Sequence, residues 1–331
     1  MHKIVNTLAV ALSVLPGLPS VAVAAEPTPG RWSDVTPSGI DLANRLSCEN
    51  YGSITMVADP ARPSNLFTQF HCQGVWKSVD YGLTWTGPIN TGRAGAGVRG
   101  AGGLAIARGP DEQPPILYSA GIRGTGVGFW KSTDGGVSWT NYRVAPGGDR
   151  QGFYPPVVNP YDPNHLVMTG HQRSLIVQSF DGGRQWSEVA IADGMKHIGG
   201  TGFIFFIDTR HAGTTADTWI WTAEATGRKI GTWRTSDRGR TWTKVDNNEH
   251  PHGQMQIYHP DKSGIVFMPG FHSDIGAGVL RSTDYGETWS PVGIAMDQAV
   301  VFGTPKRVYA MYAWACGGCL LDPALQSAPQ P

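Results

Sequence analysis

The ten residues WKSTDGGVSW, at positions 130 to 139, belong to a motif that occurs five times, and this repetition constrains the fold more than any other feature. The other copies are WKSVDYGLTW from residue 76, VQSFDGGRQW from 177, WRTSDRGRTW from 233 and LRSTDYGETW from 280. All five fit Ser/Thr-x-Asp-x-Gly-x-x-Trp, called the box motif below. Their aspartates follow at intervals of 47 to 56 residues and are Asp80, Asp134, Asp181, Asp237 and Asp284. Such a period predicts an array of supersecondary units.

The box motif has a structural interpretation in every copy. Asp and Ser/Thr side chains bond the backbone amides of a tight turn, the glycine allows a positive φ, and the tryptophan packs against strands. The alternative, in which the five aspartates are catalytic acids or nucleophiles, is less favoured because the same turn recurs at the same place in every repeat. We therefore interpret all five aspartates as structural.

The segments around each box motif have the composition of β-strands. Two strand-like runs joined by a Pro- or Gly-rich turn precede each box, as in 53–70, and a third strand leads into it. A fourth follows, which predicts a four-stranded antiparallel blade with the box between its third and fourth strands. A glycine stands before each first strand, as expected for an innermost strand with little room. These glycines are Gly52, Gly103, Gly152, Gly202 and Gly253.

On these motifs the chain resembles the Asp-box (BNR) repeat propellers, which include sialidases, xyloglucan-degrading glycosidases and sortilin-type receptors. The resemblance implies an all-β fold, a β-propeller of four-stranded antiparallel blades. No sixth box follows the fifth, so we expect about five and a half of seven blades here and a chain truncated at its C-terminal end. The family contains both enzymes and receptors, so the fold alone does not give the function. No FRIP-like arginine motif stands near the N-terminus, which argues against sialidase activity itself.

Composition agrees with many short strands, and the numbers of positive and negative side chains are equal. The 331 residues include 44 Gly, 24 Pro and 12 Trp, and only 16% are charged. Lys plus Arg and Asp plus Glu each number 26, so bulk charge predicts neither a nucleic-acid nor a membrane partner. We expect a monomer that acts on a polysaccharide or oligosaccharide.

Residues 1–25 have the pattern of a secretory signal peptide, with Lys3, a short apolar run and a small-residue stretch ending in Ala24 and Ala25. Residues 26–331 then form a single propeller domain of a secreted protein, where disulfides are permitted. Cys48 and Cys72 are both expected at the end of the first blade that lies opposite its box turn, so a disulfide bond between them is plausible. Cys316 and Cys319 suggest a small local loop rather than a zinc site. No cofactor or metal is expected.

The end of the blades opposite the box turns, called the top face, collects most of the unusual polar residues. Long loops gather polar residues in any case, but this concentration favours a ligand site. The candidate catalytic residues are His171, Tyr154, His252, Glu249 and Asp274. The candidate substrate-binding residues are Arg150, Arg173, Arg123, Tyr51 and Gln151.

Two enzymatic mechanisms and one binding function fit these residues. In a polysaccharide lyase, Arg150, Arg173 and Arg123 would clamp a uronate carboxylate while His171 and Tyr154 carry protons. In a glycoside hydrolase, two carboxylates from Asp149, Glu249, Asp274 and Asp297 would act as acid and base or nucleophile. In a non-catalytic propeller the same face would hold a glycan or a protein. The pair His250 and His252 could bind a metal, although polar loop histidines are the simpler interpretation.

Overall fold

The computed structural model describes the following residues, to which every structural statement below refers: 34–41, 53–98, 103–110, 113–122, 126–196, 202–207, 217–223, 231–247, 257–258, 264–269, 279–291, 298–300 and 309–311. The chain divides into two compact units, Met1–Val35 and Thr36–Pro331. In the first unit only Asp34 and Val35 are described, and all of the described strands belong to the second unit.

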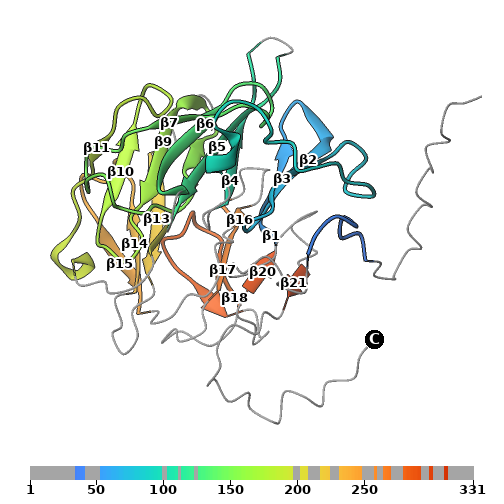
Figure 1. The fold of residues 1–331 in the computed structure, drawn as a ribbon. Coiled ribbons are helices and arrows are strands. Elements are labelled where there is room, and N and C mark those ends of the chain that lie inside the picture. Colours follow the sequence, from blue (N-terminus) through green and yellow to red (C-terminus); the bar gives the residue numbers. More distant parts are fainter. Residues whose placement is uncertain are drawn as a thin grey trace, which may run out of the picture. The chain divides into compact units, whose positions relative to one another are not determined.

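The second unit is an all-β propeller of antiparallel sheets, one sheet for each box motif (Figure 1). The first sheet contains β1 (Ser53–Asp59), β2 (Arg62–Phe70) and β3 (Gly74–Ser78), and a bridge from Lys77 to Thr86 begins its fourth strand. The second contains β4 (Leu104–Ala107), β5 (Ile116–Gly121), β6 (Gly128–Ser132) and β7 (Thr140–Tyr142). The third contains β8 (Val157–Asn159), β9 (Asp162–Thr169), β10 (Ile176–Ser179) and β11 (Ser187–Glu188).

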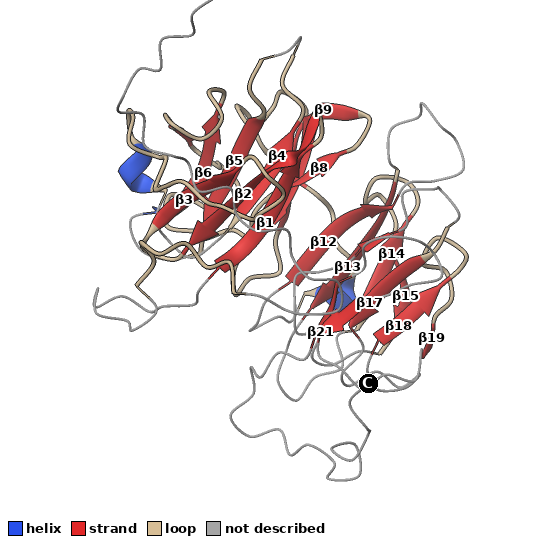
Figure 2. Cartoon of the chain, turned by 90° about the vertical axis from the view of Figure 1, so that its right-hand side faces the viewer, coloured by secondary structure: helices blue, strands red, loops and turns tan. Residues whose placement is uncertain are grey.

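The fourth and fifth sheets repeat the same order. The fourth contains β12 (Gly202–Ile207), β13 (Thr218–Ala223), β14 (Thr232–Thr235) and β15 (Thr243–Asp246). The fifth contains β16 (Ile257–Tyr258), β17 (Val266–Pro269), β18 (Val279–Ser282) and β19 (Ser290–Pro291). A hairpin of β20 (Gln298–Val300) and β21 (Tyr309–Met311) follows, and β20 contacts β17. The described helices are the short 3-10 turns Gly95–Gly97 and Asp193–Met195, so strand dominates the fold (Figure 2).

Each box motif forms the turn between the third and fourth strands of its sheet, as predicted. In every copy the Ser or Thr hydroxyl donates to the Asp carboxylate over 2.7 or 2.8 Å and accepts from the Gly amide over 2.8 or 2.9 Å. The amide four residues after the Asp donates to the same carboxylate over 2.9 Å. The box glycines all have positive φ, between 80° and 95°. The five aspartates therefore have the structural contacts expected of a turn.

The box tryptophans follow one pattern with one exception. Four of the indoles donate to the carbonyl of their own box glycine, as Trp139 does to Gly136 over 2.9 Å. Trp242, in the fourth box, donates instead to the Ala190 carbonyl over 2.9 Å. Its indole therefore links the fourth box turn to the chain that leaves the third sheet.

Neighbouring sheets meet along their first strands. Strand β1 contacts β4, β4 contacts β8, and β8 and β9 contact β12. A Cβ on Gly103 would lie 2.6 Å from the Thr55 side chain, and one on Gly152 would collide with the Ile122 carbonyl oxygen. These two glycines are therefore required by the close approach of adjacent blades, as the sequence predicted, while Gly52 and Gly253 lie outside the described residues.

The hydrophobic core lies between adjacent sheets. Phe129 of the second sheet and Met168 of the third are both fully buried in one cluster, in which Trp186 packs edge-on against Phe129 at 5.0 Å between centroids. Burying a side chain such as Phe129 contributes about 1.5–3 kcal/mol to the stability of the folded state. Trp76 and Trp130 are also buried, and Trp233 is half-buried.

Candidate functional site

The link between the second and third sheets, residues 143–156, carries four of the residues predicted to form the site, namely Asp149, Arg150, Gln151 and Tyr154. Its chain turns at Gly147 and Gly148, whose φ angles of 93° and 84° favour glycine. After this turn the link approaches the end of β9, where Phe153 forms a bridge with Gly170. The link is thus bound to the turn between β9 and β10, which carries the predicted residues His171 and Arg173.

Tyr154 and His171 are in contact at this junction. Their ring centroids lie 5.7 Å apart in an edge-on arrangement. Backbone hydrogen bonds fix both positions, from the Tyr154 amide to the Thr169 carbonyl over 3.0 Å and from the His171 amide to the Gly152 carbonyl over 2.8 Å. Tyr154 is buried and His171 is half-buried. The two predicted proton carriers therefore lie side by side.

Gln151 and Arg173 also belong to this junction. The Gln151 amide nitrogen donates to the Gly152 carbonyl over 2.6 Å and to the His171 carbonyl over 3.0 Å. Arg173 Nη1 donates to the Gly147 carbonyl over 3.2 Å. The fold thus brings together four of the predicted residues from two separate segments, whereas Arg150 is exposed on the same link. Their chemical roles stay predictions.

A pocket of about 280 Å³ opens beside the same link, between it and strands β6 and β7. The side chains that give it its chemistry are Asn141, Tyr142, Arg143, Asp149 and Gln151. Phe153, fully buried, lines it as well, next to the backbone of Gly128 and Gly148. Gln151 therefore belongs both to the pocket and to the junction that holds His171.

One ion pair dominates the electrostatics of the pocket. Arg143 Nε lies 2.7 Å from Asp149 Oδ1, and the two side chains are 71% and 72% exposed. An ion pair at this exposure stabilises a fold by about 0–1 kcal/mol. Its contribution to the fold is therefore small, and its charges are accessible to a ligand.

Gln151 and Asp149 were predicted from the sequence as site residues, but Arg143 and Tyr142 were not. These two lie at the end of the second sheet's fourth strand and just beyond it, where the sequence indicated only blade structure. The one available signal was the arginine placed six residues before an aspartate, across the Gly147 and Gly148 turn.

The remaining predicted site residues lie outside the described part of the chain. They are Tyr51, Arg123, Glu249, His250, His252, Asp274 and Asp297, together with Cys48, Cys316 and Cys319. Among the described residues no group of three or more His, Cys, Asp or Glu side chains could hold a metal ion. The helices within those residues are too short or too polar to cross a membrane.

Comparisons with known proteins support the fold. No protein-family model matches the sequence, and no curated protein matches it. The WD40 domain of Toxoplasma gondii coronin has 13% identity and a TM-score of 0.50, over 75% of this chain and 61% of that one. At this identity the likeness shows the β-propeller fold alone.

Two GH74 structures match with lower TM-scores. The Niastella koreensis GH74 enzyme has 15% identity and a TM-score of 0.38, over 80% of this chain and 49% of its own. The GH74 xyloglucanase from Xanthomonas campestris has 15% identity and a TM-score of 0.31, over 75% and 51%. This chain thus spans about half the length of these two proteins, and 31% of an ancestral GH74 enzyme that it also matches.

Proposed function

We propose that this chain is a carbohydrate-active member of the Asp-box (BNR) repeat propellers, which binds a polysaccharide or oligosaccharide at the 143–156 link and cleaves a glycosidic bond there. The observation that carries the proposal is the continuity of the pocket with the junction: Gln151 lines the pocket and donates to the carbonyl of His171. The same segment therefore lines the binding surface, carries Tyr154 and is hydrogen-bonded to His171.

The pocket has the chemical character of a small saccharide site. Its volume of about 280 Å³ lies near the lower end of the range for small-molecule sites. The Tyr142 ring offers an apolar face, and the Asn141 and Gln151 amides offer polar atoms for hydroxyl groups. A sugar presents both kinds of surface, with C–H groups on its faces and hydroxyls around its rim.

For cleavage we favour β-elimination of a uronate-containing glycan, because Tyr154 and His171 are in contact and both can move protons. One of them removes the proton next to the sugar carboxylate, the C–O bond to the leaving sugar breaks, and a carbon–carbon double bond forms. The other returns a proton to the leaving oxygen. An arginine that binds the carboxylate makes the first proton more acidic.

Hydrolysis uses different residues and is separated from elimination by one screen. It would depend on two carboxylates such as Asp149 with Glu249 or Asp274. The screen incubates the protein with neutral and acidic polysaccharides and records reducing ends and the ultraviolet absorbance of unsaturated uronates. Both signals mean elimination, and reducing ends alone mean hydrolysis. The absence of both signals contradicts cleavage and leaves a non-catalytic glycan- or protein-binding propeller.

We further infer that the protein is secreted as a monomer after cleavage near Ala24 or Ala25 and that Cys48 bonds to Cys72. Cys72 follows β2 and is not a free thiol. N-terminal sequencing of the exported protein tests the cleavage site. Peptide mapping without reductant should recover the two cysteine peptides linked, and their separate recovery would contradict the pairing.

A further inference from the structure

We propose that the pocket selects an acidic saccharide, whose carboxylate binds the guanidinium of Arg143 while Asp149 holds that guanidinium in place. This inference rests on the proposed saccharide binding and assigns the residue that recognises the carboxylate of an acidic sugar. It uses an arginine outside the clamp predicted from sequence. Arg173 is directed to the Gly147 carbonyl, neither Arg173 nor Arg150 lines the pocket, and Arg123 lies outside the described residues.

The geometry of the ion pair leaves the two terminal amino groups of Arg143 available to a ligand. A guanidinium carries five N–H donors in a planar fork. In the contacts of the described residues, Arg143 uses its Nε, which donates to Asp149 Oδ1 over 2.7 Å. The two terminal amino groups can then donate in parallel to a carboxylate, which is the bidentate arrangement that arginine favours. Asp149 acts as a positioning residue.

The other polar side chains of the pocket are suited to hydroxyl groups rather than to a carboxylate. The Gln151 amide nitrogen donates to the Gly152 and His171 carbonyls, and the Asn141 amide nitrogen donates to the Phe129 carbonyl over 3.4 Å. Their oxygen atoms remain as acceptors, which bind hydroxyls and repel carboxylates. Arg143 is the cationic side chain among the lining residues, so the carboxylate has one favourable position.

The balance of charge also predicts which ligands the pocket rejects. Arg143 and Asp149 cancel at long range, so a small inorganic anion gains little from entering. An acidic sugar gains the short-range contact with Arg143 and, in addition, the contacts of its ring and hydroxyls. Selection should therefore require the carboxylate and the sugar together.

The test compares uronic acid trisaccharides with their methyl esters, which keep the shape and lose the charge. The full chain is titrated with both by calorimetry, as wild type and as Arg143→Gln, Asp149→Asn and Arg184→Gln, the last being an exposed arginine of the third box turn that serves as control. We expect wild type to bind the acids at least about tenfold more tightly than the esters. Arg143→Gln should lose this preference and keep ester binding, while Arg184→Gln should behave as wild type.

The variant Asp149→Asn distinguishes two roles of Asp149, which are to position Arg143 through a hydrogen bond and to place a negative charge beside the ligand. The asparagine keeps an acceptor for Arg143 Nε and removes a negative charge beside the ligand, so acid binding should become tighter by a few-fold with ester binding unchanged. Equal binding of acids and esters by wild type, or unchanged acid binding in Arg143→Gln, overturns the acidic substrate class and leaves saccharide binding intact. Absence of binding for every acid and ester overturns both proposals.

Discussion

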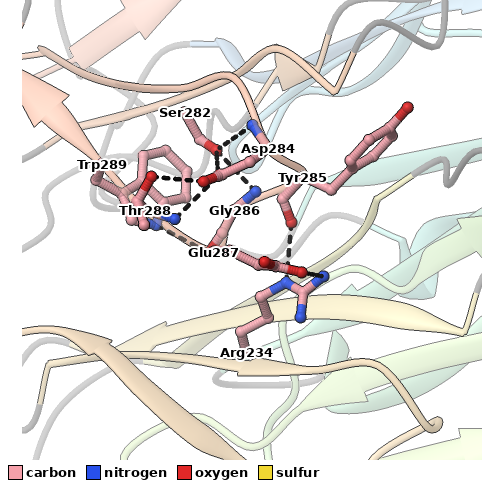
Figure 3. A network of polar contacts seen from close by, with 8 residues as sticks. All are labelled: Arg234, Ser282, Asp284, Tyr285, Gly286, Glu287, Thr288 and Trp289. Atoms are coloured by element: carbon pink, nitrogen blue, oxygen red, sulfur yellow. Dashed lines mark hydrogen bonds and ion pairs between the residues drawn. The ribbon is translucent and has the colours of Figure 1, made fainter.

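Arg234 in β14 of the fourth sheet donates from Nε to the backbone carbonyl of Tyr285 in the fifth box turn over 3.0 Å (Figure 3). Its Nη2 also lies 3.2 Å from Glu287 Oε1 in the same turn. Lys131 makes the equivalent contact between the second and third sheets, where Nζ donates to the Gly182 carbonyl over 3.1 Å. In both cases the cation directly precedes the Ser or Thr that begins the box motif, and the carbonyl belongs to the residue after the next box aspartate. Adjacent blades are thus joined through their box turns.

Replacing Arg234 with Met should destabilise the protein by about 1–3 kcal/mol, because the Tyr285 carbonyl and Glu287 lose a half-buried charged donor. Urea unfolding measures the change. Arg240→Met, at an exposed arginine of the fourth box turn, is the matched control and should alter stability by less than about 0.5 kcal/mol. Equal stability of the two variants would show that the contact between blades adds nothing.

The box aspartates predict a loss of stability in acid. Hydrogen bonds from the Thr84 hydroxyl and amide and from Ser78 lower the pKa of Asp80 from 3.8 to about 2. Burial alone would raise the pKa of the other four box aspartates, but their hydrogen bonds outweigh it and lower each pKa below 3.8. The unfolded chain therefore binds more protons than the folded one once the pH drops below about 4.

Stability from these five carboxylates should be fully present above pH 4 and should decrease as the pH falls toward 2. Thermal unfolding followed by circular dichroism between pH 5 and pH 2 records the decrease. Asp80→Asn should be less stable at pH 5 and should lose less on acidification. If the wild type and Asp80→Asn curves run parallel, the Asp80 carboxylate is not a source of the pH dependence.

The environment of His165 in β9 predicts a second loss of stability on acidification, at a higher pH than that of the box aspartates. It is buried against Phe180 in a stacked arrangement with centroids 4.5 Å apart, and it reaches Phe206 and Trp219 of the fourth sheet at 5.2 and 5.9 Å. Burial, the largest influence, lowers the pKa of His165 below 6.5, although Gln178 acts in the opposite direction. Because the folded pKa is lowered, the unfolded chain binds the extra proton first as the pH falls below 6.5, and stability is lost in that window.

The variant His165→Asn isolates this effect. It should be less stable at pH 8, because a ring packed between two sheets is removed. Between pH 7 and pH 5 it should lose less stability than the wild type in urea unfolding. An identical pH dependence of the two proteins would assign the window to other histidines.

The box turns were predictable from sequence because their partners are local. In the second sheet Ser132, Asp134, Gly136 and Trp139 contact one another within eight residues, so the motif itself determines the turn. Five copies at regular intervals then required similar blades and, through them, a propeller. The redirected indole of Trp242 could not be predicted, because its acceptor, Ala190, belongs to a link 52 residues away.

The candidate site was predictable only in part, because some of its contacts join residues that are not neighbours in the sequence. The contact of Tyr154 with His171 followed from blade topology, since the link that enters a sheet and the turn between its second and third strands share one end. The pocket did not follow. It depends on the turn at Gly147 and Gly148 and on the Arg173 hydrogen bond that holds this turn, neither of which a repeat pattern specifies.

His171 provides the most direct test of catalysis at this site. Replacing it with Ala should reduce turnover of a true substrate by about 10²- to 10⁴-fold, the usual contribution of a residue that transfers a proton in the transition state. The fold should persist, because the His171 amide that donates to the Gly152 carbonyl is retained and the ring is only half-buried. Urea unfolding of His171→Ala checks this point, and Tyr154→Phe, which keeps the ring and removes the hydroxyl, tests its partner. Undiminished turnover in a folded His171→Ala variant would remove His171 from the mechanism and transfer the proposed acid and base roles to His252 or to the carboxylates Asp274 and Glu249.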